Sequence, residues 1–579
     1  MDETSMRNSD LNPFDRLLHA TEGRLTSGLS PTSAMLAYLD WAVHLANSPG
    51  KQAELVQKAF RKSVKFSAFL EQAMTGETNM ACIEPLPQDH RFLAPEWQEM
   101  PYAAWYQSFL LLQQWWYNAT SSIEGVSEHA QNVASFSARQ ILDMFSPSNF
   151  PATNPEVLKA TRESGGMNLV RGFQNFIEDW ERAVLKKPPL GVENFRVGHE
   201  VAITPGKVVY RNHLIELIQY APTTDKVQAE PILIVPAWIM KYYILDLSPN
   251  NSMVKYLVDQ GHTVFMISWK NPTEEDRNLG MDDYIQNGVV EALEAVRAIV
   301  PKQKVHAVGY CIGGTLLSIA AAALSRDGRD WIKTITLFAA QMDFTDAGEL
   351  MLFIDQSQVS FLEDMMWEKG FLDAKQMAGT FQLLNSNDLI WSRMVHDYLM
   401  GQRRPMIDLM AWNADATRMP YRMHSQYLEG LFLNDDFAGG RYYVNGKPAT
   451  PSDIRAPIFM VGAERDHVAP WKSVYKVNFL TDTDVTFQLT SGGHNAGIIS
   501  EPGHPHRHFR IATKPEGEPY VEPDEWYATT KQTEGSWWPT WQDWLSGQSG
   551  ARVSPPGMGK PKGKYKPLCD APGTYVLED

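Results

Sequence analysis

The residues best suited to covalent chemistry stand in the segment Gly309-Tyr310-Cys311-Ile312-Gly313, where a cysteine lies between two glycines. A strand-like apolar run precedes it and an apolar helical pattern follows, so Cys311 falls at a sharp strand-to-helix turn. Glycines two positions before and after remove side chains that would collide in so tight a turn. A helix N-terminus favours a thiolate and offers a backbone amide to an oxyanion. We therefore predict a nucleophile; the alternative, a buried cysteine between packing glycines, is disfavoured by this setting.

Such a nucleophile needs a base, and an acid that orients the base, and the sequence offers both. One strand-like run ends at Asp466 and a later one ends at His494, which gives the chain order nucleophile, acid, base. Both residues fall at carboxyl ends of strands, where parallel sheets place their active sites. We predict that His494 takes the thiol proton and that Asp466 holds the imidazole. His467 is a competing base, but a loop histidine beside a carboxylate already in use is more typical of a solvated side chain.

The same turn predicts where an oxyanion would be held. One donor is the backbone amide of Ile312, the first residue after the nucleophile. A second donor is expected from the loop after an early strand, and the apolar run over 231–239 contains such a strand. We expect the backbone amides of Trp238 and Ile239 to complete the oxyanion hole with Ile312.

The elements that must position these residues alternate between strands and helices. Helical patterns cover 281–299 and 312–325, whereas 208–220 resembles a hairpin that enters a sheet. Strand-length apolar runs cover 231–239, 263–269, 304–310, 331–340, 457–466 and 485–494. Apolar strands that alternate with helices indicate a predominantly parallel sheet covered on both faces. With the cysteine turn, this pattern predicts an α/β class protein with an α/β-hydrolase core.

Two domains are expected from the change in pattern along the chain. Residues 1–195 show apolar side chains at helical spacing and almost no strand-like runs, so they predict a helical N-terminal domain. Residues 196–579 form the expected catalytic domain. Within it, residues about 345–445 carry many Met, Phe and Leu residues at helical spacing, which predicts a helical cap inserted between two strands. The Pro, Gly and Lys content of 553–573 is typical of an extended tail.

Composition excludes several classes of function. The formal net charge of −16 disfavours nucleic acid and anionic lipid as partners of the whole chain. The 3 cysteines are far apart, so neither a disulfide framework nor a zinc site is indicated. The histidines of GHPHRHFR stand in a Pro and Gly loop, which is more typical of exposed side chains than of metal ligands. No transmembrane run or secretory signal is recognisable, so a cytoplasmic protein is expected.

Several motifs resemble those of the polyhydroxyalkanoate synthases, and together they cover nearly the whole chain. The cysteine turn is similar to that family's lipase-like box, and the stretch 236–272 is similar to its most recognisable segment. The other matching motifs are DHRFLAPEW (89–97), SPSNFPATNP (146–155), WNADATRMP (412–420), GAERDHVAPW (462–471) and SGGHNAGIIS (491–500). The family's catalytic Cys, Asp and His fall on Cys311, Asp466 and His494.

The resemblance implies a class I-like, single-subunit synthase that joins (R)-3-hydroxyacyl units from coenzyme A thioesters into a polyester. It implies no cofactor, a homodimer formed through the cap region, and association with the surface of polymer granules in the cytoplasm. Trp412 and Asp415 belong to a family motif in the cap, although simple cap packing would also explain them. The tryptophans at 537, 538, 541 and 544 share a helical face, for which the alternatives are granule contact and packing on the sheet.

Cysteine suits this reaction because a chain held as a thioester is close in energy to the incoming thioester.

Two rival functions use the same residues. An acyl-CoA thioesterase on the same fold would use the same triad but release free hydroxy acid. An inactive granule-surface protein would bind polymer without releasing coenzyme A, and the intact triad counts against it.

Overall fold

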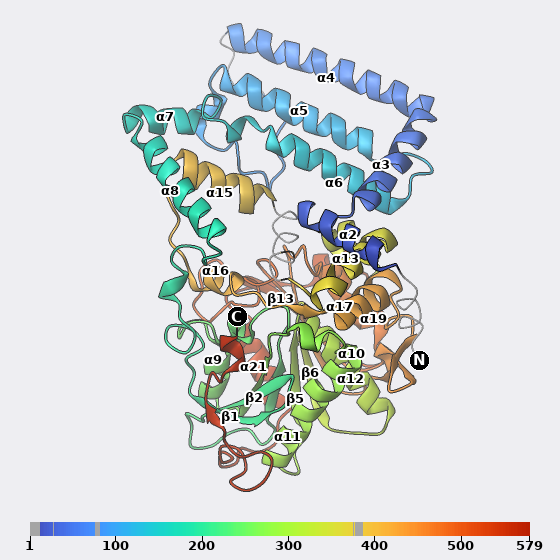
Figure 1. Ribbon diagram of the computed structural model, residues 1–579, viewed down its shortest axis with the longest axis vertical. Helices are drawn as coiled ribbons and strands as arrows, with labels where there is room; N and C mark the ends of the chain where they lie inside the picture. The colour runs from blue at the N-terminus through green and yellow to red at the C-terminus, as the bar shows by residue number, and fades with distance from the viewer. Residues whose placement is uncertain (1–11, 27, 76–80, 374–375, 377–385, 579) are drawn as a thin grey trace. The chain divides into compact units, whose positions relative to one another are not determined.

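Two compact units make up the chain in the computed structural model, which describes residues 12–26, 28–75, 81–373, 376 and 386–578 (Figure 1). The catalytic unit comprises Met1–Arg24, Gly191–Met377 and Met406–Asp579, and the helical unit comprises Leu25–Leu190 and Ala378–Pro405. Part of the expected cap interval therefore belongs to the helical unit. Each unit is described by itself.

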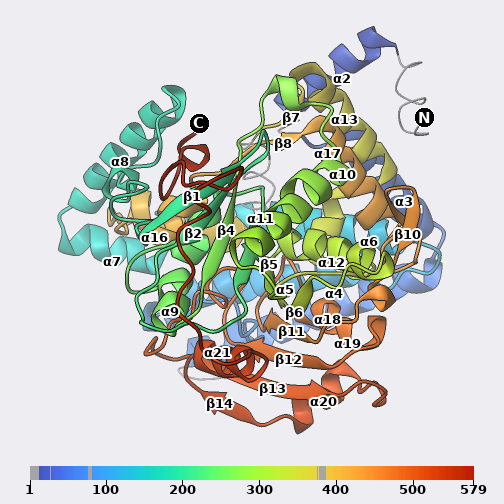
Figure 2. The ribbon, with the colours of Figure 1, turned by 90° about the horizontal axis from the view of Figure 1, so that it is seen from below.

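The catalytic unit is built on an 11-stranded sheet with the order β14-β13-β12-β11-β6-β5-β3-β4-β2-β1-β15. The central strands from β4 to β12 run parallel, and antiparallel strands close both edges (Figure 2). The strands are β1 (Gly206–Arg211), β2 (Ile215–Tyr220), β3 (Ile232–Val235), β4 (Val264–Trp269), β5 (Val305–Tyr310), β6 (Ile332–Phe338), β11 (Ile458–Ala463), β12 (Val485–Thr490), β13 (His508–Lys514), β14 (Gln532–Glu534) and β15 (Cys569–Asp570). This sheet confirms the predicted α/β class.

The central strands form where they do because their side chains are apolar on both faces. Every residue of β3, β4, β5, β11 and β12 is buried, as expected for parallel strands covered by helices on both sides. The predicted run 231–239 is a strand only from Ile232 to Val235, because Pro236 has no amide to donate to the sheet. The predicted hairpin over 208–220 is formed by β1 and β2.

Helices cover both faces of the sheet. On one face, Trp541 of α21 donates its indole N–H to Thr336 Oγ1 on β6 at 3.0 Å, and Trp538 of the same helix contacts Tyr256 of α9. On the other, α12 packs against β5 and α11 against β3. The helices of the unit are α2 (Pro13–Leu25), α9 (Met253–Asp259), α10 (Met281–Asp283), α11 (Glu291–Ile299), α12 (Ile312–Arg326), α13 (Gln356–Lys369), α16 (Asp408–Asn413), α17 (Tyr421–Tyr427), α18 (Trp471–Tyr475), α19 (Val477–Leu480), α20 (Pro523–Thr529) and α21 (Trp538–Gly547).

The interval between β6 and β11 holds more strand than the sequence analysis expected. Besides its helices it contains the short pair β7 (Phe371–Leu372) and β8 (Met419–Pro420) and the hairpin of β9 (Tyr442–Val444) and β10 (Lys447–Ala449). The hairpin turns at Asn445 and Gly446, whose φ angles are 53° and 73°. An Asn-Gly pair is the strongest short signal for such a turn, so the sequence carried this information.

The helical unit packs its helices side by side, with α5 between α4 and α6 (Figure 1). Its helices are α3 (Pro31–Ala46), α4 (Pro49–Thr75), α5 (Tyr102–Thr120), α6 (Glu128–Met144), α7 (Pro155–Glu163), α8 (Met167–Val184) and α15 (Ser392–Met394). Its largest buried cluster centres on Phe92, Trp97 and Tyr106. The predicted helices over 34–46, 53–74 and 102–117 fall within α3, α4 and α5.

The motif over 89–97 ties a loop of the helical unit to two of its helices. Arg91 forms ion pairs with Asp89 at 2.8 Å and with Asp143 of α6 at 2.7 Å. Trp97 donates its indole N–H to Glu156 of α7 at 2.9 Å. Because these groups are largely buried, the motif over 89–97 holds the helical unit together rather than presenting a reactive group.

Among the helices of the described ranges, none is both long enough and apolar enough to cross a membrane.

Candidate active site

Cys311 occupies the sharp turn between β5 and α12. It is the residue before the first turn of α12 and has φ 53° and ψ −130°, a strained conformation for a residue with a side chain. A Cβ on Gly309 would lie 2.4 Å from Gly314 Cα, and one on Gly313 would lie 2.4 Å from the Pro236 carbonyl oxygen. The two glycines are therefore required by close backbone approach, as the sequence predicts.

Asp466 and His494 meet beyond the carboxyl ends of β11 and β12. His494 Nδ1 donates to Asp466 Oδ2 at 2.7 Å, and the side chain of Asp466 is fully buried. The other carboxylate oxygen accepts the backbone amides of Val468 and Ala469, both at 2.8 Å. These two amides fix the carboxylate, so the imidazole is held with Nδ1 towards Asp466.

The structure brings Cys311 to the same imidazole. The pKa of His494 is raised well above its ordinary value: burial acts to lower it, but the Asp466 carboxylate and the hydrogen-bonded Cys311 sulfur outweigh burial. With Nδ1 committed to Asp466, Nε2 is the atom left for the sulfur. Three residues that are far apart in sequence thus form one Cys–His–Asp chain, which can generate a thiolate and return a proton to a leaving group.

The competing base, His467, does not share this arrangement. The Asp466 carboxylate is already occupied by His494 and by two amides. Within the described parts of the chain, the His467 side chain makes neither a hydrogen bond nor an ion pair.

The segment that leads to two of the predicted oxyanion donors touches the start of α12, because a Cβ on Gly313 would meet the carbonyl oxygens of Val235 and Pro236. The Ile312 amide opens the helix, where no carbonyl of the same helix can accept it. The Trp238 carbonyl accepts the Thr417 hydroxyl at 2.5 Å. Because a trans peptide directs its C=O and N–H to opposite sides, the Ile239 amide is turned away from Thr417.

Two tyrosines border the nucleophile. Burial, and then the nearby Cys311, raise the pKa of both Tyr310 and Tyr427 well above 10, so both remain neutral. Tyr427 ends α17, and its ring lies 6.5 Å from that of Trp238 and 6.3 Å from that of Phe344. The sequence analysis missed Tyr427, because an aromatic residue at helical spacing carries no sign of its distant neighbour.

The remaining motif residues serve packing. Trp412 donates its indole N–H to the Lys241 carbonyl at 2.8 Å, and Asp415 accepts the Tyr243 hydroxyl at 2.9 Å. Both contacts tie the cap to the segment that follows β3. Of the four tryptophans on the predicted face, those at 537, 538 and 541 are fully buried, and Trp544 is half-buried with its ring 5.1 Å from that of Phe459 on β11. Of the two alternatives for this face, the structure favours packing on the sheet.

A Cys–His–Asp chain at a strand-to-helix turn of an α/β-hydrolase sheet is the site of an acyl-transferring enzyme. Comparison with known proteins identifies which kind of acyl-transferring enzyme this is. Residues 9–51 match the model "Poly-beta-hydroxybutyrate polymerase N terminal", residues 88–257 match "Poly-beta-hydroxybutyrate polymerase (PhaC) N-terminus", and residues 230–500 match "alpha/beta hydrolase fold".

Curated relatives agree along most of the chain. The poly(3-hydroxyalkanoate) polymerase of Methylorubrum extorquens is 40% identical over 507 residues, which cover 87% of this chain and 83% of that protein. The corresponding subunit of Cupriavidus necator is 36% identical over 530 residues, which cover 90% of this chain and 87% of that protein. The chain therefore belongs to the poly(3-hydroxyalkanoate) polymerase family, and the predicted resemblance is confirmed.

Proposed function

We propose that this enzyme polymerises (R)-3-hydroxyacyl units from coenzyme A thioesters into a polyester, with Cys311 carrying the growing chain. The observation that carries this proposal is the Cys311–His494–Asp466 arrangement in a chain that matches poly(3-hydroxyalkanoate) polymerases over most of its length. No metal or redox cofactor is needed for any step.

Loading begins with transfer of the thiol proton from Cys311 to His494 Nε2. The sulfur attacks the thioester carbonyl of the substrate and forms a tetrahedral oxyanion. Collapse of this intermediate breaks the carbon–sulfur bond to coenzyme A, which leaves with the proton held on His494. Because one thioester replaces another, loading is nearly balanced in free energy and can be followed by a second transfer.

Elongation uses the same imidazole as a base. His494 takes the proton from the 3-hydroxyl group of the next hydroxyacyl-CoA, whose oxygen attacks the thioester on Cys311 and forms an ester bond. The Cys311 sulfur leaves as a thiolate and the proton remains on His494. The lengthened chain is now a coenzyme A thioester, and the thiolate attacks its carbonyl to load the chain back onto Cys311, while the proton on His494 leaves with coenzyme A. Asp466 keeps the imidazole in the required tautomer throughout, and its two backbone amide donors keep the carboxylate in place.

The oxyanion of each step is assigned to the backbone amides of Ile312 and of Trp238 or Ile239. The support is positional: the Ile312 amide opens α12 beside the nucleophile, and the Ile239 amide points away from Thr417. Water must be kept from the acyl-enzyme, or hydrolysis replaces elongation. Tyr427 and Phe344 supply the apolar wall over this region.

Association with polymer granules in the cytoplasm is part of the proposal, because the product is an insoluble apolar polyester. Its structural support is the helical unit, where α8 exposes a stripe of apolar side chains that includes Phe173 at 64% and Trp180 at 59%. A homodimer formed through the cap region is also proposed, on the family resemblance of the motif around Trp412.

The test measures coenzyme A release from (R)-3-hydroxybutyryl-CoA together with the turbidity of polymer. Wild type should give both signals, and Cys311→Ala should give neither. Release of coenzyme A without polymer would instead identify a thioesterase. Release that survives in Cys311→Ala would remove Cys311 from the mechanism, and granule binding without any release would identify an inactive coat protein.

A further inference from the structure

One side of helix α4 in the helical unit carries a dense row of cations. Lys58, Arg61, Lys62 and Lys65 stand three and four residues apart, so they project from the same side of the helix. The whole chain carries a formal net charge of −16. Four cations along two turns are therefore a local concentration of charge opposite in sign to that of the molecule.

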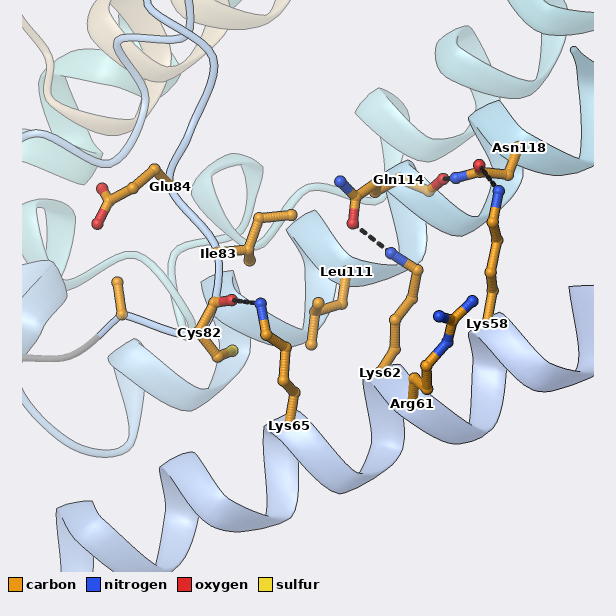
Figure 3. A pocket seen from close by; sticks show the side chains of 11 residues that line it. Lys58, Arg61, Lys62, Lys65, Cys82, Ile83, Glu84, Leu111, Gln114 and Asn118 are labelled. Atoms are coloured by element: carbon orange, nitrogen blue, oxygen red, sulfur yellow. Dashed lines mark hydrogen bonds between the residues drawn. The ribbon is translucent and has the colours of Figure 1, made fainter.

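These side chains line a cavity of about 560 Å³ (Figure 3). Helix α5 forms the facing wall with Leu111, Gln114 and Asn118, and the segment 81–84 forms a third side. The lining contains four cationic side chains and one carboxylate, that of Glu84. Leu111 of α5 and Ile83 of the segment 81–84 add apolar side chains to the lining, so one cavity offers both charged and apolar groups.

The partners of these cations inside the cavity are neutral. Lys58 donates to the Asn118 side-chain oxygen, Lys62 to that of Gln114, and Lys65 to the Cys82 carbonyl at 3.2 Å. Lys58 also pairs with Glu54 on its own helix at 2.6 Å. Arg61, Lys62 and Lys65 form no ion pair with any described residue, and the Glu84 carboxylate of the same lining pairs with none of them.

This arrangement carries an electrostatic cost that an anion would relieve. Burial, followed by repulsion from Lys58, Lys65 and Arg61, lowers the pKa of Lys62. Like charges held this close destabilise each other unless a counter-charge lies between them. Amide side chains such as Gln114 and Asn118 can also turn their N–H groups towards an anion.

We propose that this cavity is a binding site for a small phosphate-bearing molecule with at least two negative charges. Lysine ammonium groups and the arginine fork are the side chains that proteins use for phosphate, and the guanidinium of Arg61 can bind two phosphate oxygens at once. The apolar wall of Leu111 and Ile83 fits a ligand with a flat or aliphatic part next to its phosphates. The nucleotide end of coenzyme A and free pyrophosphate are two sources of this chemistry.

A small molecule fits better than a macromolecule. The cations lie in a cavity walled by α4, α5 and the segment 81–84, whereas a nucleic-acid backbone or a bilayer needs a long, open basic surface. The strongly acidic remainder of the chain would repel both of those polyanions.

The experiment titrates pyrophosphate and adenosine 3′,5′-bisphosphate into the full-length Cys311→Ala protein by calorimetry at low ionic strength. That background prevents turnover, and neither probe is a substrate, so the result does not depend on the proposed polymerase reaction. Both probes should bind saturably, and K62Q/K65Q should weaken binding at least about tenfold, because two charge-assisted contacts are lost. Equal affinity for the probes would assign recognition to the phosphates alone, and tighter binding of the nucleotide would assign a share to the apolar wall.

A matched control is the double variant K186Q/K187Q, which removes the same charge from exposed positions after α8. It should bind as the parent does and keep the parent's thermal midpoint, whereas K62Q/K65Q should unfold at or above that midpoint, because it removes like charges that repel each other. The proposal is overturned if neither probe binds, if both double variants lose affinity equally, or if only anionic vesicles or an oligonucleotide bind.

Discussion

The two units of this enzyme bury their apolar side chains to very different extents. In the catalytic unit the central strands are buried along their whole length, and Trp537 and Trp541 are 0% exposed. In the helical unit, Phe60 is 69% exposed and Trp180 is 59% exposed. The difference separates two regions: the catalytic unit holds its atoms in fixed positions, whereas the helical unit exposes the apolar and charged side chains on which the granule and phosphate proposals rest.

The largest expected effect tests how firmly the catalytic unit fixes its triad. In Asp466→Asn the remaining oxygen can still accept the amides of Val468 and Ala469, but the new N–H₂ group faces His494 Nδ1. The imidazole should change tautomer, so that Nε2 can no longer accept the thiol proton. We expect kcat/KM for coenzyme A release to fall by roughly 10³–10⁴. His467→Gln is the control and should retain wild-type kcat/KM; equal losses in the two variants would contradict the assignment.

Because Trp541 is buried and Trp180 is exposed, replacing each with alanine should lower the free energy of unfolding by different amounts. Trp541→Ala removes a buried ring that contacts Phe338 and donates to Thr336, and it should lower the free energy of unfolding by about 3–5 kcal/mol. Trp180→Ala makes the same chemical change on an exposed face and should shift it by less than about 0.5 kcal/mol. Denaturant titration of both variants measures the difference. A large loss in Trp180→Ala would show that α8 is packed, and would weaken the case for a granule-binding face.

The strand-to-helix turn offers a narrower test of packing. In Gly313→Ala the new Cβ would lie 2.4 Å from the Pro236 carbonyl oxygen and 2.5 Å from that of Val235, so backbone must move. We expect a loss of about 3 kcal/mol in unfolding free energy, together with reduced coenzyme A release. Gly547→Ala at the end of α21 meets no atom within 4 Å and is the matched control. Wild-type stability in Gly313→Ala would show that the turn is looser than the structure indicates.

The smallest expected effect is a loss of stability in acid, which tests how completely His262 is buried in the catalytic unit. Burial, with a contribution from Arg552, lowers the pKa of His262 to about 4, and neither ring nitrogen has a hydrogen-bond partner among the described residues. The unfolded chain therefore takes up this proton first, so stability is lost as the pH falls from 6.5 towards 4. Between pH 7 and pH 5 this histidine should cost about 2 kcal/mol. His262→Leu should lose correspondingly less stability over that interval, and an identical loss in both proteins would contradict the assignment.

Much of the catalytic unit could be predicted because its signals are local. Apolar runs of strand length define β3, β4, β5, β6, β11 and β12, and the two glycines around Cys311 define the turn that strains it. The hairpin at Asn445 was equally visible but was overlooked within a helical pattern. The division of the expected cap between two units was not predictable, because helical spacing shows which face of a helix is apolar but not what covers it.

The sequence by itself determined the class of fold, and it predicted the nucleophile and the order of acid and base along the chain. These follow from backbone sterics at a few glycines and from the alternation of apolar strands and helices. Only the tertiary structure decided that His494 rather than His467 meets Asp466, since two adjacent strands must carry their loops to one place. It also decided that the row of cations on α4 lines a cavity, because the second wall comes from α5, which is remote from α4 in sequence and near it only after folding.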